Sequence, residues 1–192
     1  NNPAFDEREH QKQMVAFLGT DHRRIECTDA DIGHAFPNVI WHTEWPILRT
    51  SPTPMYLLSK LVQQNGRKVV LTGEGADELF TGYHYMKHFP FHKLNMEARR
   101  CIGNLHNINL QRANRMGMLF SLELRVPYLD VDMVDLAMKI PPELKIREYE
   151  RTGDRIEKWI LRKAFEDTDH LPEDILWRYK VQYTQGAGCE SL

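Results

Sequence analysis

The chain has 192 residues, 42% of them hydrophobic, which is enough to bury one sizeable core. Its formal net charge is -2 with both signs interspersed, so no general basic field supports nucleic-acid binding. No stretch resembles a transmembrane span or a signal peptide. Cys27, Cys101 and Cys189 lie far apart and form no C-x-x-C pair, which favours reduced thiols in a cytoplasmic protein without a structural zinc site.

The N-terminal part is expected to contain two helices. Residues 6–18 have helix-compatible apolar spacing, and Gly19 follows as a stop signal. Asp29 or Asp31 is expected to cap the second helix, whose start Pro37 leaves open.

A third helix is expected to lead into a strand. Thr53 resembles an N-cap followed by Pro54 at the first helical position, and apolar residues such as Leu58 then recur at helical spacing. The strand 69–72 follows directly, so helix and strand alternate as in an α/β domain with a parallel sheet. In such sheets ligands bind at the carboxyl ends of strands, which is where Gly73 falls.

The turn after this strand reads Gly-Glu-Gly-Ala-Asp-Glu. Gly73 and Gly75 let the backbone approach a ligand closely, and N–H groups at a helix start can hold anionic oxygen. The carboxylates of Glu74, Asp77 and Glu78 make a poor phosphate cradle on charge alone, so a metal ion or an ammonium group should accompany any nucleotide. The alternative is a tight turn whose acids favour the positive end of the helix dipole.

The second half of the chain is predicted to be mainly helical. Apolar residues define helices around 110–119 and from Asp130 to the stop at Pro141, and a further helix is expected to begin near Asp154.

Three cations in this half are candidates for binding an anion. Lys158 and Arg162 fall four residues apart on the last expected helix, so both can point toward one phosphate. The alternative is a solvated cationic stripe with Glu157 as counter-charge. Arg125 sits in an apolar run and is expected either to be paired in the core or to face a ligand.

His84, His88 and His92 recur at four-residue spacing, which on one helix face would favour a metal site. Pro90 interrupts that face, so we expect surface or aromatic-packed histidines instead. The sequence contains no P-loop, G-x-S-x-G elbow or G-x-G-x-x-G fingerprint, so hydrolase and dehydrogenase interpretations lack their defining pieces.

Several segments are more informative together than any one of them alone. In chain order they read TPMYL at 53–57, VVLTGEGADELF at 69–80, GY at 82–83, LELRVPYLD at 122–130, EKWILR at 157–162 and ILWR at 175–178, before Lys180 and Gly186. These ordered motifs closely resemble the synthetase domain of glutamine-dependent asparagine synthetases, and the resemblance covers nearly the whole chain.

The resemblance implies an adenine-nucleotide α-hydrolase-like parallel sheet with a helix-rich C-terminal half, in which ATP lies across the strand ends. It implies ATP-dependent amidation of aspartate to asparagine through β-aspartyl-AMP, with release of pyrophosphate. Mg²⁺ would balance the phosphate charge. Ammonia would come from glutamine hydrolysis in an N-terminal glutaminase domain, and a homodimer is left open.

The resemblance also implies roles for individual residues. Thr72, Gly73 and Glu74 match the segment beside the nucleotide and the activated aspartate, with Glu74 as the base that takes a proton from attacking ammonia. Asp77 matches the acid that holds magnesium or the substrate amino group. Lys158 matches the lysine that steadies departing pyrophosphate, a role that suits a mobile point charge.

Other positions are weaker matches or departures. Arg49, Arg125 and Lys180 are weaker candidates for anion contacts. Thr81 stands where a glycine is common in the family, a change expected to be mild. The family's pyrophosphate loop, Ser-Gly-Gly-x-Asp-Ser, and its glutaminase domain do not occur within residues 1–192.

We therefore expect residues 1–192 to be a partial synthetase domain of a longer ligase. One alternative is a related enzyme that adenylates a different carboxylate. Another is a non-catalytic synthetase-like module, against which the retention of Glu74, Asp77 and Lys158 argues.

Overall fold

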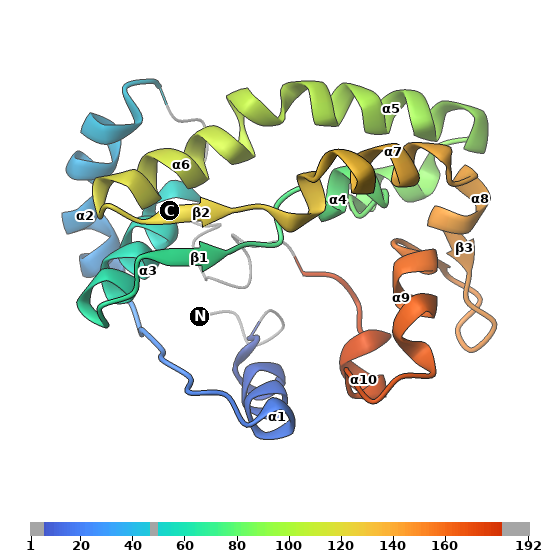
Figure 1. Cartoon of the computed structure of the whole chain (residues 1–192), viewed down its shortest axis with the longest axis horizontal. Helices are drawn as coiled ribbons and strands as arrows, with labels where there is room; N and C mark the ends of the chain where they lie inside the picture. The colour runs from blue at the N-terminus through green and yellow to red at the C-terminus, as the bar shows by residue number, and fades with distance from the viewer. Residues whose placement is uncertain (1–5, 47–49, 182–192) are drawn as a thin grey trace. The chain divides into compact units, whose positions relative to one another are not determined.

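A computed structural model describes residues 6–46 and 50–181 (Figure 1). The chain divides into two compact units. The first unit comprises Asn1–Leu71, Ile108–Arg125 and Val181–Leu192, and the second comprises Thr72–Asn107 and Val126–Lys180. Among the residues so described, no helix is long and apolar enough to cross a membrane.

The first unit combines helices with a pair of parallel strands. Its described elements are α1 (Arg8–Leu18), α2 (Asp29–Thr43), α3 (Pro52–Gln64), β1 (Val69–Leu71), α6 (Asn109–Leu119) and β2 (Glu123–Arg125). The strands pair in register, with Val69 opposite Glu123 and Leu71 opposite Arg125. The predicted parallel α/β arrangement is confirmed, but the sheet has two strands in the described part of the chain, so the larger nucleotide-binding sheet stays a prediction.

Helix starts in this unit differ from expectation. Thr28 caps α2, and Asp31 completes a capping box: the Asp31 amide donates to Thr28 Oγ1 at 3.1 Å, and the Thr28 amide donates to the Asp31 carboxylate at 2.8 Å. The helix continues through Pro37. Asp31 thus takes part in the cap as a partner of Thr28 rather than as the cap itself.

The third helix is confirmed, but its predicted cap is wrong. It begins at Pro52, and Thr53 is fully buried inside it. Leu57 is 9% exposed and belongs to the core, whereas Leu58 is 44% exposed. Helix α3 packs against both α2 and α6 and buries Leu57 rather than Leu58.

A small apolar core holds the first unit together. Leu57 packs with Ile32 of α2, and Tyr56 meets the ring of Phe120 edge-on with centroids 5.1 Å apart.

The second unit is built mainly of short helices. Its elements are α4 (Ala76–Leu79), η2 (His84–His88), α5 (Phe91–Asn104), η3 (Leu105–Asn107), η4 (Pro127–Leu129), α7 (Val131–Lys139), α8 (Pro142–Lys145), β3 (Arg147–Glu148), β4 (Arg155–Ile156), α9 (Trp159–Glu166) and α10 (Glu173–Leu176). Strands β3 and β4 pair antiparallel, with Arg147 opposite Ile156. The predicted helices around 110–119 and from Asp130 are confirmed as α6 and α7, and Asp130 caps α7.

Apolar side chains from distant segments fix the end of α4 in this unit. Leu79 and Phe80 form one core cluster with Ala137 of α7, and a second cluster joins Met86 to Leu94. These contacts anchor the segment that carries Glu74 and Asp77.

The helix expected to begin near Asp154 begins five residues later. Ile156 belongs to β4, Lys158 adopts a left-handed conformation with φ 56°, and α9 starts at Trp159. The Lys158 amide donates to the Phe80 carbonyl at 3.2 Å. This bond to a distant segment competes with a helical start, so Lys158 and Arg162 do not share a helix face as predicted.

Candidate functional site

The turn at Gly73–Ala76 begins the candidate site, and its two glycines differ. A Cβ at Gly75 would lie 2.4 Å from the Leu129 side chain, and Gly75 has φ 95°, so both packing and backbone require glycine there. At Gly73 an added Cβ would meet nothing within 4 Å. The Glu74 amide donates to Thr72 Oγ1 at 3.4 Å, which orders the residues leading into α4.

Asp77 lies between two lysines that come from different segments of the second unit. Lys158 Nζ is 2.6 Å from Asp77 Oδ1, and Lys180 Nζ donates to Asp77 Oδ2. The Asp77 side chain is 26% exposed, and both lysine side chains are 23% exposed. Residues that stood in separate motifs therefore form one half-buried ionic cluster, which we call the Asp77 cluster.

The two ammonium groups keep Asp77 ionised. Burial alone would raise the pKa of this carboxyl, but Lys158 and Lys180 outweigh burial and hold the pKa below its usual range. The cluster thus carries two cations and one anion.

Gly82 makes the contact between Asp77 and Lys158 possible. A Cβ at this position would lie 2.2 Å from Asp77 Oδ1 and 2.4 Å from Lys158 Cε. Its amide donates to the Asp77 carbonyl at 2.7 Å, which holds the turn closed over the carboxylate. Glycine at this position therefore has a packing reason that local sequence does not reveal.

Thr81, which precedes Gly82, is fully buried and has φ 54°. This left-handed conformation is the physical reason why glycine suits the position. A change to threonine is therefore less mild than expected, because the backbone carries strain that the surrounding packing must hold.

Glu78 is buried and has a different environment from Asp77. It is 2% exposed, and its carboxylate accepts a hydrogen bond from the Tyr83 hydroxyl. Burial raises the pKa of Glu78. Asp77 is paired with cations, whereas Glu78 is inside the protein. An interaction with the positive end of the helix dipole therefore does not by itself explain these two acids.

A second ionic group lies next to Lys158 in the sequence. Glu157 is 1% exposed; its Oε1 is 2.9 Å from Arg162 Nη2, and its Oε2 is 2.6 Å from Lys87 Nζ. Burial alone would raise the pKa of Glu157, but the two cations outweigh it and the pKa lies below its usual range. Arg162 is therefore an internal partner of Glu157, neither on a solvated stripe nor beside Lys158 on one helix face.

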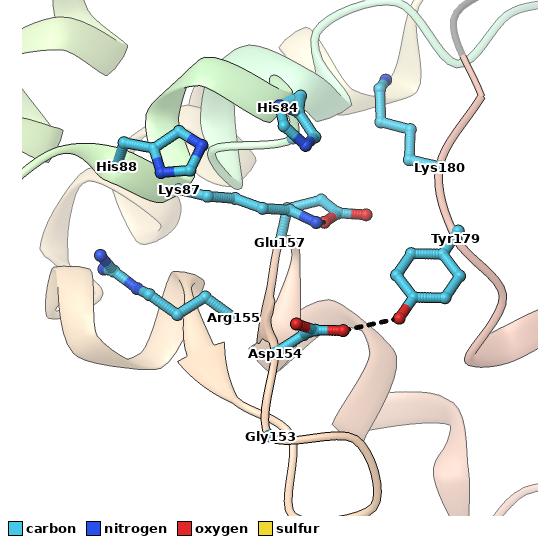
Figure 2. A pocket seen from close by; sticks show the side chains of 10 residues that line it. His84, Lys87, His88, Gly153, Asp154, Arg155, Glu157, Tyr179 and Lys180 are labelled. Atoms are coloured by element: carbon cyan, nitrogen blue, oxygen red, sulfur yellow. Dashed lines mark hydrogen bonds and ion pairs between the residues drawn. The ribbon is translucent and has the colours of Figure 1, made fainter.

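A cavity of about 350 Å³ lies within the second unit (Figure 2). Its lining residues are Gly82, His84, Lys87, His88, Gly153, Asp154, Arg155, Glu157, Tyr179 and Lys180. The Tyr179 hydroxyl donates to Asp154 Oδ2 at 2.7 Å across it. Lys180 belongs to both the cavity wall and the Asp77 cluster, so the cavity leads to the candidate site.

The three histidines do not share one helix, as the position of Pro90 predicted. His84 and His88 lie in η2 with ring centroids 5.7 Å apart, and His92 belongs to α5 beyond Pro90. Across residues 6–46 and 50–181 no group of three or more His, Cys, Asp or Glu side chains could hold a metal ion. The donor set around Asp77 consists of ammonium groups, so these residues do not by themselves form a metal site.

Arg125 and Arg49 are the two other anion contacts that the family resemblance predicts. Arg125 ends β2 in the first unit, is exposed, and pairs with Glu123 at 2.7 Å, which contradicts the first of its two alternatives, pairing in the core. Arg49 lies outside the described residues. A role for either residue at the nucleotide stays a prediction.

Comparison with known proteins gives the family. The family model described as asparagine synthase matches residues 1–101 and 92–190. The chain belongs to the asparagine synthase family. Individual members are also similar to it over most of its length.

A nodule asparagine synthetase (glutamine-hydrolyzing) of Pisum sativum is 42% identical over 182 residues, which cover 92% of this chain and 31% of that protein. Asparagine synthetase (glutamine-hydrolyzing) 1 of Arabidopsis thaliana is 41% identical over the same shares. A probable asparagine synthetase (glutamine-hydrolyzing) of Schizosaccharomyces pombe is 40% identical over 186 residues, covering 92% of this chain and 33% of that protein. The chain thus spans about a third of the length of these curated relatives.

Some residues of this asparagine synthase family chain escaped sequence reasoning. Gly82 and Glu157 belong to the family motifs, but the sequence suggested no role for Gly82 and only a counter-charge role for Glu157, and Lys87 lies in none of those motifs. A signal existed for Glu157, since it lies between Ile156 and the apolar run that begins at Trp159. No local signal pointed to Lys87, because its partner is 70 positions away.

Proposed function

We propose that this chain contributes the adenylating site of an ATP-dependent ligase that converts aspartate to asparagine. The observation that carries the proposal is that one ionised, half-buried carboxylate, Asp77, is held by Lys158 and Lys180 beside the turn of Glu74. A site with mobile ammonium groups suits a polyphosphate substrate, because lysine binds phosphate as a point charge. Family membership supports the same reaction class.

The reaction would proceed in two balanced steps. An oxygen of the aspartate side-chain carboxylate attacks the α-phosphorus of ATP, and the bond to the leaving pyrophosphate breaks. Ammonia then attacks the activated carbonyl carbon, the C–O bond to AMP breaks, and one ammonia proton must be removed. The sum is aspartate, ATP and ammonia giving asparagine, AMP and pyrophosphate.

Lys158 and Lys180 would stabilise the first step. Each can exchange its contact with Asp77 for a phosphate oxygen, so that positive charge follows the negative charge that develops on the leaving group. Asp77 would keep both ammonium groups in place between turnovers and bind the substrate amino group. Both roles of Asp77 require an ionised carboxylate, and its lowered pKa keeps the group ionised.

Glu74 would act in the second step as the base that accepts the proton from attacking ammonia. It precedes Asp77 by three residues, on a turn that Gly75 and Leu129 hold in place. Thr72 and Gly73 would contribute backbone and hydroxyl contacts to the nucleotide, and Gly73 has no neighbouring group that an added Cβ would meet.

The remaining components rest on the family. The relatives are described as glutamine-hydrolyzing, so we propose that ammonia comes from glutamine in a glutaminase domain of the full protein, in the cytoplasm. Mg²⁺ is proposed to enter with the nucleotide phosphates, since such ions need only one or two protein carboxylates. The roles proposed for Asp77, Lys158, Lys180 and Glu74 do not depend on Mg²⁺.

The test uses the full-length natural protein with ATP and ammonium ions. Equal concentrations of aspartate and of glutamate, which is longer by one methylene, are compared, and AMP and amide product are measured. The proposal predicts AMP and asparagine with aspartate and little of either with glutamate. If AMP formed only with another carboxylate, that compound and not aspartate would be the substrate. If no carboxylate gave AMP, the result would indicate a non-catalytic module.

A further inference from the structure

A buried arginine connects the two chain segments that bring lysines to Asp77. The Arg162 side chain is 11% exposed, and its Nη2 lies 2.9 Å from Glu157 Oε1. Its Nε donates to the Glu157 carbonyl at 3.0 Å. One guanidinium therefore holds both the side chain and the backbone of the residue directly before Lys158.

The same guanidinium holds the segment that carries the second lysine. Arg162 Nη1 donates to the carbonyls of Leu176 and Arg178, the latter at 3.1 Å. Arg178 precedes Lys180 by two residues. A planar group with five donors in fixed directions can bridge these segments, whereas a lysine at the same place has a single nitrogen.

Glu157 fixes the orientation of this guanidinium. It is 1% exposed and is bound from its other oxygen by Lys87 at 2.6 Å. Buried ion networks often contribute little net stability, because desolvation offsets the attraction. The main effect of the network is therefore geometric, because it specifies where residues 157–158 and 176–180 lie.

Lys158 in particular needs such support. Its φ of 56° is unfavourable for a residue with a Cβ and persists only where the surroundings over-determine it. The carbonyl of Glu157 is held by Arg162, and the amide of Lys158 donates to Phe80 at 3.2 Å. The peptide group between Glu157 and Lys158 is thus fixed at both its oxygen and its nitrogen.

We propose that Arg162, oriented by Glu157, is a positioning residue that places Lys158 and Lys180 on opposite oxygens of Asp77. It touches none of the reacting atoms and acts through the two lysines. The inference rests on the proposed function for its catalytic consequence, but the placement of the lysines can be measured separately.

The test is Arg162→Lys in the full-length protein, which keeps the charge and removes the fork of donors. Arg151→Lys is the matched control, because Arg151 is an exposed arginine paired with Glu173. The first readout is the titration of the Asp77 carboxyl by carbon-13 NMR of aspartate-labelled protein, assigned by loss of its signal in Asp77→Asn. Loosened lysines should raise the Asp77 pKa by roughly one unit, and Arg151→Lys should leave it in place.

The second readout is asparagine synthesis. Arg162→Lys should lower kcat roughly 10- to 100-fold, as expected for small misplacement of catalytic groups, with a smaller change in KM for ATP. A purely structural role would lower the amount of folded enzyme without changing the Asp77 titration of the folded fraction. If Arg162→Lys does not fold, Glu157→Gln, which keeps the shape, is measured in the same way.

The outcomes separate the two claims. An unchanged Asp77 titration together with kcat equal to that of Arg151→Lys would overturn the positioning role. A raised Asp77 pKa in a protein whose wild type makes no AMP from aspartate would support the positioning role and refute the proposed function.

Discussion

The ammonium group of Lys158 lies 2.6 Å from the carboxylate of Asp77, although Lys158 occupies a left-handed backbone conformation outside any helix. The contact depends on Gly82, whose missing side chain leaves the space that both groups occupy. The strained backbone, the glycine and the ion pair therefore form one arrangement, and each can be tested alone.

Replacing Lys158 with methionine should reduce aspartate-dependent pyrophosphate release about 10²- to 10³-fold, because it removes one cation that we propose stabilises the leaving group. The measurement is steady-state pyrophosphate release by the full-length enzyme. Lys163→Met is the control, since Lys163 is on the exposed side of α9 and pairs with Glu166. Equal rates in the two variants would exclude Lys158 from the mechanism.

Replacing Glu74 with glutamine should separate the two half-reactions. Adenylation does not need the base, so aspartate-dependent ATP–pyrophosphate exchange should remain near the wild-type rate. Asparagine formation should fall about 10²- to 10⁴-fold, the usual contribution of a general base. A parallel loss of exchange and amide formation would assign Glu74 to substrate binding or adenylation instead.

Gly82→Ala should destabilise the protein by about 1–3 kcal/mol, because its Cβ would overlap the Asp77–Lys158 contact. Gly103→Ala is the matched control: it lies in α5, where an added Cβ meets nothing within 4 Å, and it should be neutral or slightly stabilising. Urea unfolding measures both free energies of unfolding. A Gly82→Ala variant as stable as Gly103→Ala, with normal activity, would contradict the packing account.

The contribution of Asp77 to stability should depend on pH. Burial alone would raise the pKa of its carboxyl, but the two lysines lower it, so the folded state binds this proton less tightly than the unfolded state. The stabilisation is therefore present above the ordinary aspartate pKa of about 3.9 and is lost as pH falls through the lower folded value.

Asp77→Asn should accordingly cost about 1–3 kcal/mol at pH 7, since it leaves two half-buried ammonium groups without their anion. The difference from wild type should shrink as pH is lowered below about 4. Urea unfolding at a series of pH values measures it, with Asp135→Asn on the exposed face of α7 as control. A difference that grows on acidification would reverse the assigned sign.

The parts of the fold that sequence predicted are those governed by local chemistry. Apolar spacing and Gly19 predicted α1, which ends in a left-handed Gly19 as expected. The strand predicted over 69–72, a segment rich in β-branched residues, is confirmed as β1, and Asp130 was identified as the start of α7, which it caps. Capping, periodicity and β-branching act within a few residues, so they are visible without tertiary contacts.

The parts that failed depend on distant partners. The first turn of the helix expected from Asp154 is replaced by β4 and a left-handed Lys158, because Lys158 bonds to Phe80 and Glu157 is buried between two cations. The candidate residues Asp77 and Lys180 were each identified by family resemblance, but their contact joins positions 103 residues apart. Such pairings follow from how the chain folds back on itself, which spacing along the sequence does not encode.

The most direct test of the central claim is ATP–pyrophosphate exchange by the full-length natural protein, with aspartate present and then omitted. Exchange reports reversible adenylation and needs no ammonia, so it isolates the step assigned to Asp77, Lys158 and Lys180. We predict exchange that requires aspartate and is lost in Lys158→Met. Folded, ATP-binding protein that shows no aspartate-dependent exchange would contradict the assignment of this site to aspartate adenylation.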